Sequence, residues 1–76
     1  MFIRLTFEND VMYINVAHIE MFKSRIKYTE IYTQIWLSNG YTVAVNETES
    51  EILKLIEEAR SNGNQAQTAN DFRIAL

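Results

Sequence analysis

Cysteine, histidine and glycine, on which many functional sites depend, are scarce in this sequence. The 76 residues include no cysteine, one histidine and two glycines. Without cysteine the chain forms neither disulfides nor thiolate metal sites. Cysteine usage therefore gives no indication of whether its cellular compartment is oxidising or reducing. With one histidine, a metal site would need carboxylates as its other ligands. The sequence also lacks a P-loop, a G-x-G-x-x-G loop, an H-E-x-x-H motif and a nucleophile elbow.

Long apolar runs are absent as well. No run approaches the roughly 18 to 20 apolar residues of a membrane-spanning helix, and no basic N-terminal region precedes an apolar stretch of the signal-peptide type. We therefore expect a cytoplasmic protein. At 76 residues the chain forms one domain, and a domain near this size buries only about 60% of its unfolded surface. Self-association would add to that marginal stability.

Acidic charge dominates only one part of the chain. The formal net charge is −3, and residues 1–45 balance four basic against four acidic side chains, so the whole acidic excess lies in residues 46–76. Nonspecific nucleic-acid binding depends on neutralising phosphates. An acidic balance therefore disfavours it.

The clearest structural signal in the sequence is a β-hairpin at residues 31–45. β-Branched and aromatic side chains favour a sheet, and Gly40 adopts the positive φ of a turn without steric cost. We expect a three-residue loop from Ser38 to Gly40, because this register gives one wholly apolar face. It pairs Leu37 with Tyr41, Ile35 with Val43 and Thr33 with Val45. The apolar face comprises Ile31, Ile35, Leu37, Tyr41, Val43 and Val45; the opposite face collects Tyr32, Gln34, Trp36, Thr42, Ala44 and Asn46.

A second hairpin is predicted nearer the N-terminus. Residues 2–8 and 11–16 alternate apolar and polar side chains on either side of the turn pair Asn9-Asp10. A two-residue loop there gives this hairpin one apolar face, with Arg4, Thr6, Tyr13 and Asn15 on the other. It pairs Phe7 with Met12, Leu5 with Ile14 and Ile3 with Val16.

Residues 17–29 fit either a helical or an extended period. The Ile, Thr, Tyr and Trp content that follows favours strands, because these side chains are stiff at χ1 or suit a pleated surface. We therefore expect a short strand near residues 19–23, a turn near Ser24 and Arg25, and a long strand that runs into the 31–45 hairpin.

A helix is predicted after the hairpins. Thr48-Glu49-Ser50-Glu51 has the capping-box pattern that begins a helix, and Asn62-Gly63 is a left-handed stop signal. Between them, Ile52, Leu55, Ile56 and Ala59 follow at helical spacing, with Leu53 on the flank. One helix of this length covers one face of a sheet.

These patterns together predict an α+β fold. It has an antiparallel sheet of four to five strands, made of two hairpins plus a middle strand, with one C-terminal helix packed on one face. Residues 1–63 form the domain, and residues 64–76 form a polar linker and a short extended tail. Phe72, Ile74 and Leu76 alternate in that tail, which suits a strand that docks on a sheet edge in cis or by exchange between subunits. The alternative is a disordered end.

The first 60 residues resemble the small FlbD-type proteins of bacterial flagellar systems. The shared features are I-x-L-T at residues 3–6, Tyr13-Ile14-Asn15 followed by His18-Ile19, I-W-L-S-N-G at residues 35–40, and Val45-Asn46-Glu47 before a helix. Residues 19–40 are longer than the family pattern, and residues 61–76 are extra. The resemblance implies a small cytoplasmic bacterial protein without catalytic activity, and it carries over no functional residue. Small phage and prophage proteins look similar.

No residue pattern in the chain indicates catalysis. His18 with Glu20 has the composition of an acid-base or metal pair, yet a lone histidine at a strand start is usually structural. The glutamates of residues 47–58 could attract a cation, but carboxylates in a first helical turn are expected from the helix dipole and the cap. We predict no enzyme activity, no catalytic residue, no cofactor and no metal.

The strongest functional signal is aromatic. Tyr28, Tyr32 and Trp36 have the same parity on the expected long strand and so form a row opposite the core, with Tyr13 nearby. Such patches mark interfaces, so we predict a module that binds a protein as adaptor, assembly factor or inhibitor. We also predict that it forms a homo-oligomer, most simply a dimer, through this aromatic sheet face. The alternative is a single-strand nucleic-acid-binding regulator, in which Tyr32 and Trp36 stack bases and Arg4, Lys23, Arg25 and Lys27 meet phosphates. The candidate partner-binding residues are Tyr13, Tyr28, Tyr32, Trp36, Phe72, Ile74 and Leu76.

Overall fold

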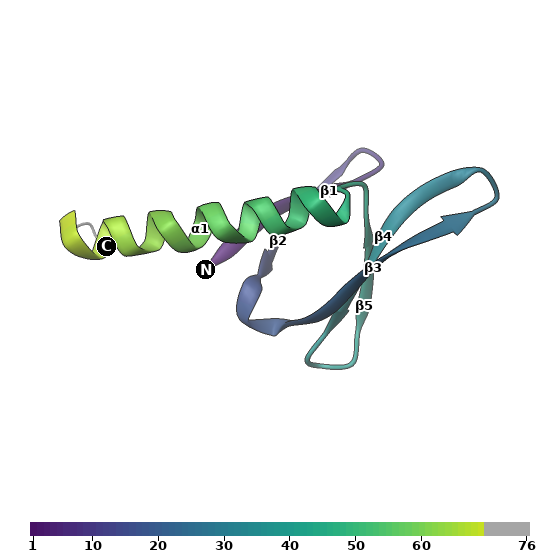
Figure 1. The fold of residues 1–76 in the computed structure, drawn as a ribbon. Helices are drawn as coiled ribbons and strands as arrows, with labels where there is room; N and C mark the ends of the chain where they lie inside the picture. Colours follow the sequence, from purple (N-terminus) through teal and green to yellow (C-terminus); the bar gives the residue numbers. More distant parts are fainter. Residues whose placement is uncertain (70–76) are drawn as a thin grey trace.

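The computed structural model describes residues 1–69 and confirms the α+β fold (Figure 1). Five strands precede one long helix. In chain order the elements are β1 (Phe2–Phe7), β2 (Asp10–Asn15), the 3-10 helix η1 (Val16–His18), β3 (Ile19–Lys27), β4 (Glu30–Leu37), β5 (Thr42–Val45) and α1 (Glu49–Ala69).

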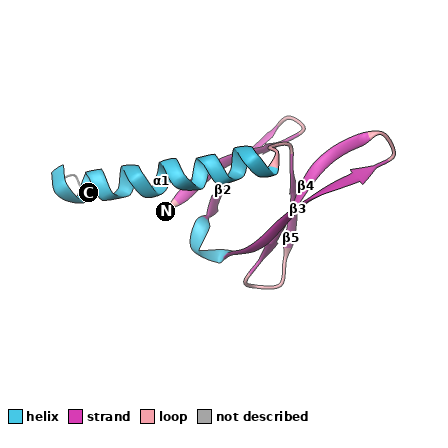
Figure 2. Cartoon of the chain, viewed as in Figure 1, coloured by secondary structure: helices cyan, strands magenta, loops and turns pink. Residues whose placement is uncertain are grey.

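The strands divide into two antiparallel sheets, where the sequence predicted one. β1 pairs with β2, and β3, β4 and β5 form a three-stranded sheet in that order. The 3-10 helix separates the two sheets along the chain (Figure 2), and the Asn15 side chain caps it by accepting a hydrogen bond from the Ala17 N–H at 3.1 Å. A short turn with its own cap redirects the chain, so β2 and β3 do not pair.

The predicted register of the 31–45 hairpin is confirmed. Thr33 pairs with Val45 and Ile35 with Val43, as expected. The loop closes through hydrogen bonds from the Leu37 N–H to the Tyr41 carbonyl at 2.9 Å and from the Gly40 N–H to the Leu37 carbonyl at 3.0 Å. Gly40 has φ of 89°, the left-handed conformation that favours glycine.

The first hairpin forms in a different register from the predicted one. Phe7 pairs with Asp10 rather than with Met12, so the loop is Glu8-Asn9. Glu8 has φ of 55°, which satisfies the need of a two-residue loop for positive φ at its first position. Because the slip is two residues, side-chain parity is kept and the apolar face is the predicted one.

The middle of the chain also differs from the prediction. β3 runs without a break through Ser24 and Arg25, and the turn lies at Tyr28-Thr29. The longer strand pairs with the whole of β4, and Glu49 accepts a hydrogen bond from the Ser24 N–H at 2.6 Å. These long-range partners outweigh the turn preference of a serine. Tyr28, with φ of 57° and 91% of its surface exposed, is a turn residue and not part of a long strand.

The start of α1 follows the prediction, whereas its predicted stop is wrong. The Glu51 N–H donates to Thr48 Oγ1 at 3.1 Å, and the Thr48 N–H donates to Glu51 Oε1 at 2.9 Å, which completes the capping box. The helix passes Asn62-Gly63 and ends at Ala69, because one internal glycine costs only about 1 kcal/mol relative to alanine. Part of the predicted linker is therefore helical. Phe72, Ile74 and Leu76 lie outside the described residues.

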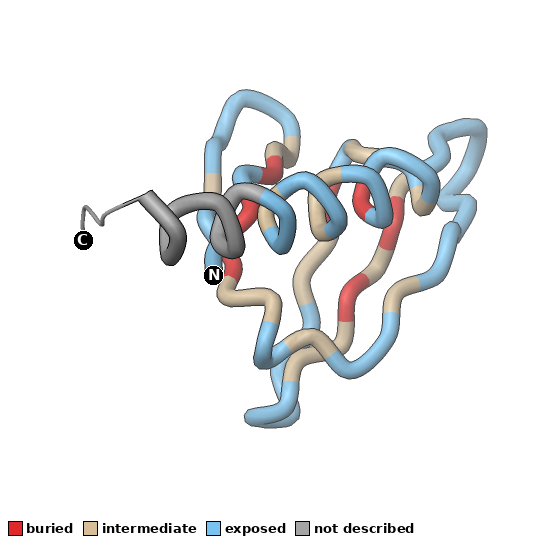
Figure 3. Tube along the Cα trace, turned by 60° about the vertical axis from the view of Figure 1, so that its left-hand side comes forward, coloured by how far each residue is buried: buried red, intermediate tan, exposed pale blue. Residues whose placement is uncertain are grey.

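The core lies between α1 and the inner faces of both sheets (Figure 3). Its buried apolar residues are Ile3, Leu5, Ile14, Ile35, Val45 and Ile52. Two members of the predicted apolar face are not in it: Ile31 is 70% exposed and Tyr41 is 72% exposed. Both lie at ends of the β4-β5 hairpin, away from the buried centre at Ile35 and Val45. Within residues 1–69, no helix has both the length and the apolar character needed to cross a membrane.

Glu47 connects the two sheets at the start of α1. Its carboxylate accepts hydrogen bonds from the Thr6 N–H at 2.9 Å and from the Thr6 hydroxyl at 2.8 Å. Its carbonyl accepts a hydrogen bond at 2.6 Å from the hydroxyl of Thr33, which is 1% exposed. The neighbouring Asn46 N–H donates to the Thr6 carbonyl at 2.7 Å. One residue therefore ties β1, β4 and the helix start together.

Candidate functional site

The three-stranded sheet has one face that points away from the core. Thr33, Ile35 and Val45 point inward and are buried, so the alternate residues of each strand point outward. We call this surface the outer face. It comprises Met21, Lys23, Arg25 and Lys27 of β3, Glu30, Tyr32, Gln34 and Trp36 of β4, and Thr42 and Ala44 of β5.

The strand register sets which side chains are neighbours on the outer face. Arg25 pairs with Tyr32, and Met21 pairs with Trp36. Side chains directly opposite each other in an antiparallel pair have Cβ atoms about 4.5–5.5 Å apart. An arginine is therefore the cross-strand neighbour of a tyrosine, and a methionine that of the tryptophan. Tyr32 and Trp36 are half-buried, and Met21 and Arg25 are exposed.

A cleft borders the outer face at its Tyr32 end. Both two-residue turns contribute to it: Glu8 comes from the β1-β2 turn and Tyr28 from the β3-β4 turn, each at positive φ. The residues of the cleft that bear polar or aromatic groups are Phe7, Glu8, Lys27, Tyr28, Thr29, Glu30, Tyr32 and Asn46. Carboxylates and an ammonium group thus lie beside two phenol rings.

The structure brings together some of the predicted site residues and separates others. Tyr32 and Trp36 share the outer face, as predicted. Tyr28 is not in a row with them, because it occupies the turn, but it lines the same cleft as Tyr32. Tyr13 lies on the other sheet, where it pairs with Arg4 and is 65% exposed. The predicted row of aromatic residues is therefore wrong beyond Tyr32 and Trp36.

The basic residues form a row that sequence reasoning missed. Lys23, Arg25 and Lys27 alternate along β3 and all lie on the outer face, whereas a turn at Ser24-Arg25 would have scattered them. The missed signal was F-K-S-R-I-K at residues 22–27, which alternates basic with apolar or small residues as a strand does. Arg4 stays apart on β1.

His18 has a local partner. Its Nδ1 lies 3.0 Å from the Ser38 hydroxyl oxygen, and both side chains are exposed. Both residues line a depression together with Tyr13, Ile14, Asn15, Leu37 and Asn39. Nowhere in residues 1–69 do three His, Cys, Asp or Glu side chains gather as metal ligands would. The His18-Ser38 contact joins the 3-10 helix to the β4-β5 loop.

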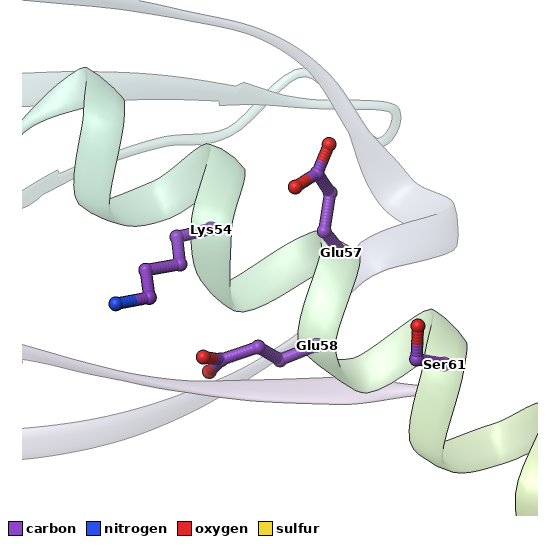
Figure 4. A pocket seen from close by; sticks show the side chains of 4 residues that line it. All are labelled: Lys54, Glu57, Glu58 and Ser61. Atoms are coloured by element: carbon purple, nitrogen blue, oxygen red, sulfur yellow. The ribbon is translucent and has the colours of Figure 1, made fainter.

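The glutamates around the helix start have structural partners. The carboxylates of Glu47, Glu49 and Glu51 each accept a backbone N–H, from Thr6, Ser24 and Thr48. Further along α1, a shallow depression is bounded by Lys54, Glu57, Glu58 and Ser61. Lys54 and Glu58 extend to the same side of the helix and Glu57 to another (Figure 4). These residues lie on successive turns of α1 and form a charged helix surface. Their side chains do not point toward a common ligand position.

Comparison of the chain with known proteins finds no matching family model, no matching curated protein and no matching solved structure. The FlbD-type resemblance stays a prediction, and the functional argument depends on the outer face.

Proposed function

We propose that the protein is a non-enzymatic binding module of the bacterial cytoplasm that binds a protein partner through its outer face and that also associates with a second copy of itself. One observation carries the proposal: Met21, Arg25, Tyr32 and Trp36 are neighbours on the sheet face opposite the one that packs on α1. Aromatic residues, methionine and arginine are the types enriched in protein interfaces, and tryptophan, tyrosine and arginine dominate their binding energy.

The charges of the cleft favour a protein partner over a phosphate backbone. Lys27 shares the cleft with the carboxylates of Glu8 and Glu30, and the chain as a whole carries −3. A polyanion would meet two like charges beside Tyr32, whereas a protein segment with both signs of charge can complement the cleft. The mixed charges of the cleft therefore discriminate against a polyanion, which a uniformly basic surface would not do.

Substitutions on the outer face test the proposal. We expect Trp36→Ala and Arg25→Glu each to weaken partner binding at least about 30-fold, the effect of losing a central interface residue. Tyr41→Ala is the matched control, because Tyr41 is 72% exposed on the β4-β5 loop and lies off the outer face. The measurement is affinity capture from the native host with each tagged variant, followed by titration of the purified partner.

Circular dichroism of each variant separates lost binding from lost folding. If a partner held by the wild type is held equally by both outer-face variants and released only by Tyr41→Ala, the outer face is not the binding surface.

The row of Lys23, Arg25 and Lys27 beside Tyr32 and Trp36 favours a second candidate, single-stranded nucleic acid. Three phosphate contacts would give a salt slope near −2 in a log–log plot, about 0.7 per contact. We expect labelled RNA and DNA oligonucleotides to bind the protein no tighter than about 100 µM at low salt, because three basic residues neutralise few phosphates. Micromolar binding that shows this slope and disappears in Trp36→Ala would reverse the ranking of the two candidates.

A further inference from the structure

The exposed strand edges of this fold are protected in different degrees. The edge of β1 is occupied at Thr6, whose N–H and carbonyl bond to Glu47 and Asn46. The edge of β3 carries three basic residues and a bulge near Ile19, and its Ser24 N–H is taken by Glu49. Charges, bulges and covering groups are the devices by which proteins keep edge strands from pairing with other chains.

β2 has few of those devices, since its one charged residue, Asp10, lies at its end. Within residues 1–69 it pairs only with β1, and its sequence D-V-M-Y-I-N has no lysine, arginine, proline or glycine. Val11 is 47% exposed and Tyr13 is 65% exposed. The strand therefore combines an unpaired edge with exposed apolar side chains, which is the arrangement that invites strand pairing.

The register shows which backbone groups of β2 are free. Thr6 pairs with Val11, and the Thr6 N–H and carbonyl point away from β2 toward Asn46 and Glu47. Thr6 and Val11 are thus a non-hydrogen-bonded pair, in which the backbone groups of Val11 also point outward. Since this direction alternates along an antiparallel strand, the N–H and carbonyl of Tyr13 point outward too.

We propose that a second copy of this chain pairs with β2 in antiparallel fashion, with the two-fold axis at Tyr13. The pairing places Val11 of each copy opposite Asn15 of the other and the two Tyr13 residues opposite each other. It joins the two-stranded sheets into one four-stranded sheet. The inference rests on the self-association included in the proposed function and names its surface.

The charge of β2 is compatible with a second copy as the occupant. Asp10 is the only charged residue of β2, and in this register the two Asp10 carboxylates lie six residues apart along the paired strands. That separation is about 20 Å at 3.4 Å per residue, beyond the Debye length of about 8 Å at physiological salt. Pairing of β2 with a second copy of β2 therefore brings no like charges close together. The outer face lies on the other sheet and stays available to a partner.

A charge reversal across the two-fold axis tests the pairing. We expect wild-type protein to sediment with twice the chain mass at micromolar concentration, with slow amide exchange at Val11 and Tyr13. Tyr13→Glu sets two carboxylates opposite each other in the dimer and should weaken association at least about 100-fold. In the monomer it lies beside Arg4, its cross-strand partner, so the fold should be retained. Tyr28→Glu, at a tyrosine that is even more exposed and lies away from β2, should leave the mass unchanged.

An equimolar mixture of Tyr13→Glu and Tyr13→Lys should restore the double mass, because opposite charges then meet at the axis. A monomeric wild type, or a Tyr13→Glu variant that remains dimeric, would overturn the inference. So would loss of the dimer when the chain is truncated after Ala69, since the terminal segment would then be the occupant. Loss of the dimer in Trp36→Ala would place self-association on the outer face instead. Partner affinity measured on monomeric Tyr13→Glu tests the outer face separately.

Discussion

Replacement of Glu47 by alanine will lower the free energy of unfolding by about 2 to 3 kcal/mol. The carboxylate accepts two hydrogen bonds from Thr6, one from its backbone and one from its hydroxyl, across 41 residues of sequence. Hydrogen bonds to charged groups contribute about 1.5 to 3 kcal/mol each, and their loss leaves a partly buried N–H without an acceptor. Because the site is only partly buried, water recovers some of that loss.

Two companion variants show whether the hydrogen bonds are the cause. Glu47→Gln keeps an oxygen for the Thr6 N–H and an amide for the Thr6 hydroxyl, so it should cost less than about half of the alanine effect. Glu57→Ala, at an exposed position of α1, should change stability by no more than about 0.5 kcal/mol. Urea unfolding followed by circular dichroism measures all three. If Glu47→Ala and Glu57→Ala lowered the free energy of unfolding equally, the hydrogen bonds from Thr6 to Glu47 would not be the cause of the loss.

Replacement of Ile52 by alanine should have a still larger effect. Ile52 is fully buried between α1 and the sheets and is the buried helix residue of the core. Isoleucine-to-alanine changes in cores cost about 2 to 5 kcal/mol, while a domain of this size has a total stability of about 4 to 11 kcal/mol at 0.05 to 0.15 kcal/mol per residue. The variant should therefore melt at a much lower temperature or fail to fold.

The next residue along α1 is its control. Leu53 has a side chain of the same size and is 55% exposed, so Leu53→Ala should cost about 1 kcal/mol or less. Thermal unfolding of both variants compares them directly. Equal losses would mean that the helix packs on the sheets through a different face from the one described.

Two local signals of the sequence predicted the local structure well, whereas the Asn9-Asp10 turn pair and the Asn62-Gly63 stop did not. The Asn39-Gly40 turn and the Thr48 capping box each specify their geometry within a few residues, and both formed as expected. The turn at Tyr28-Thr29 has no such signal, because neither residue is typical of turns. It is set by the pairing of β3 with β4 and by the bond from Ser24 to Glu49, partners that are distant in sequence.

The sequence predicted only those parts of the candidate site that follow from the alternation of side chains along one strand. Tyr32 and Trp36 are four residues apart on one strand, so alternation alone places them on one face. The basic row of β3 depends on the position of a turn that the sequence does not reveal. The cleft depends on the β1-β2 turn approaching the end of the other sheet, which is a tertiary contact between Glu8 and residues far along the chain.

The backbone of Tyr28 bears on how this chain evolves. A bulky residue at φ of 57° is disfavoured, and a side chain 91% exposed gains little from burial. Glycine or asparagine would hold the same turn with less strain, and single-base changes lead from a tyrosine codon to an asparagine codon. If selection acted on folding alone, substitutions that replace Tyr28 and its aromatic ring would therefore be favoured. In a lineage that keeps tyrosine at this position, the ring is retained for what it contacts outside its own fold.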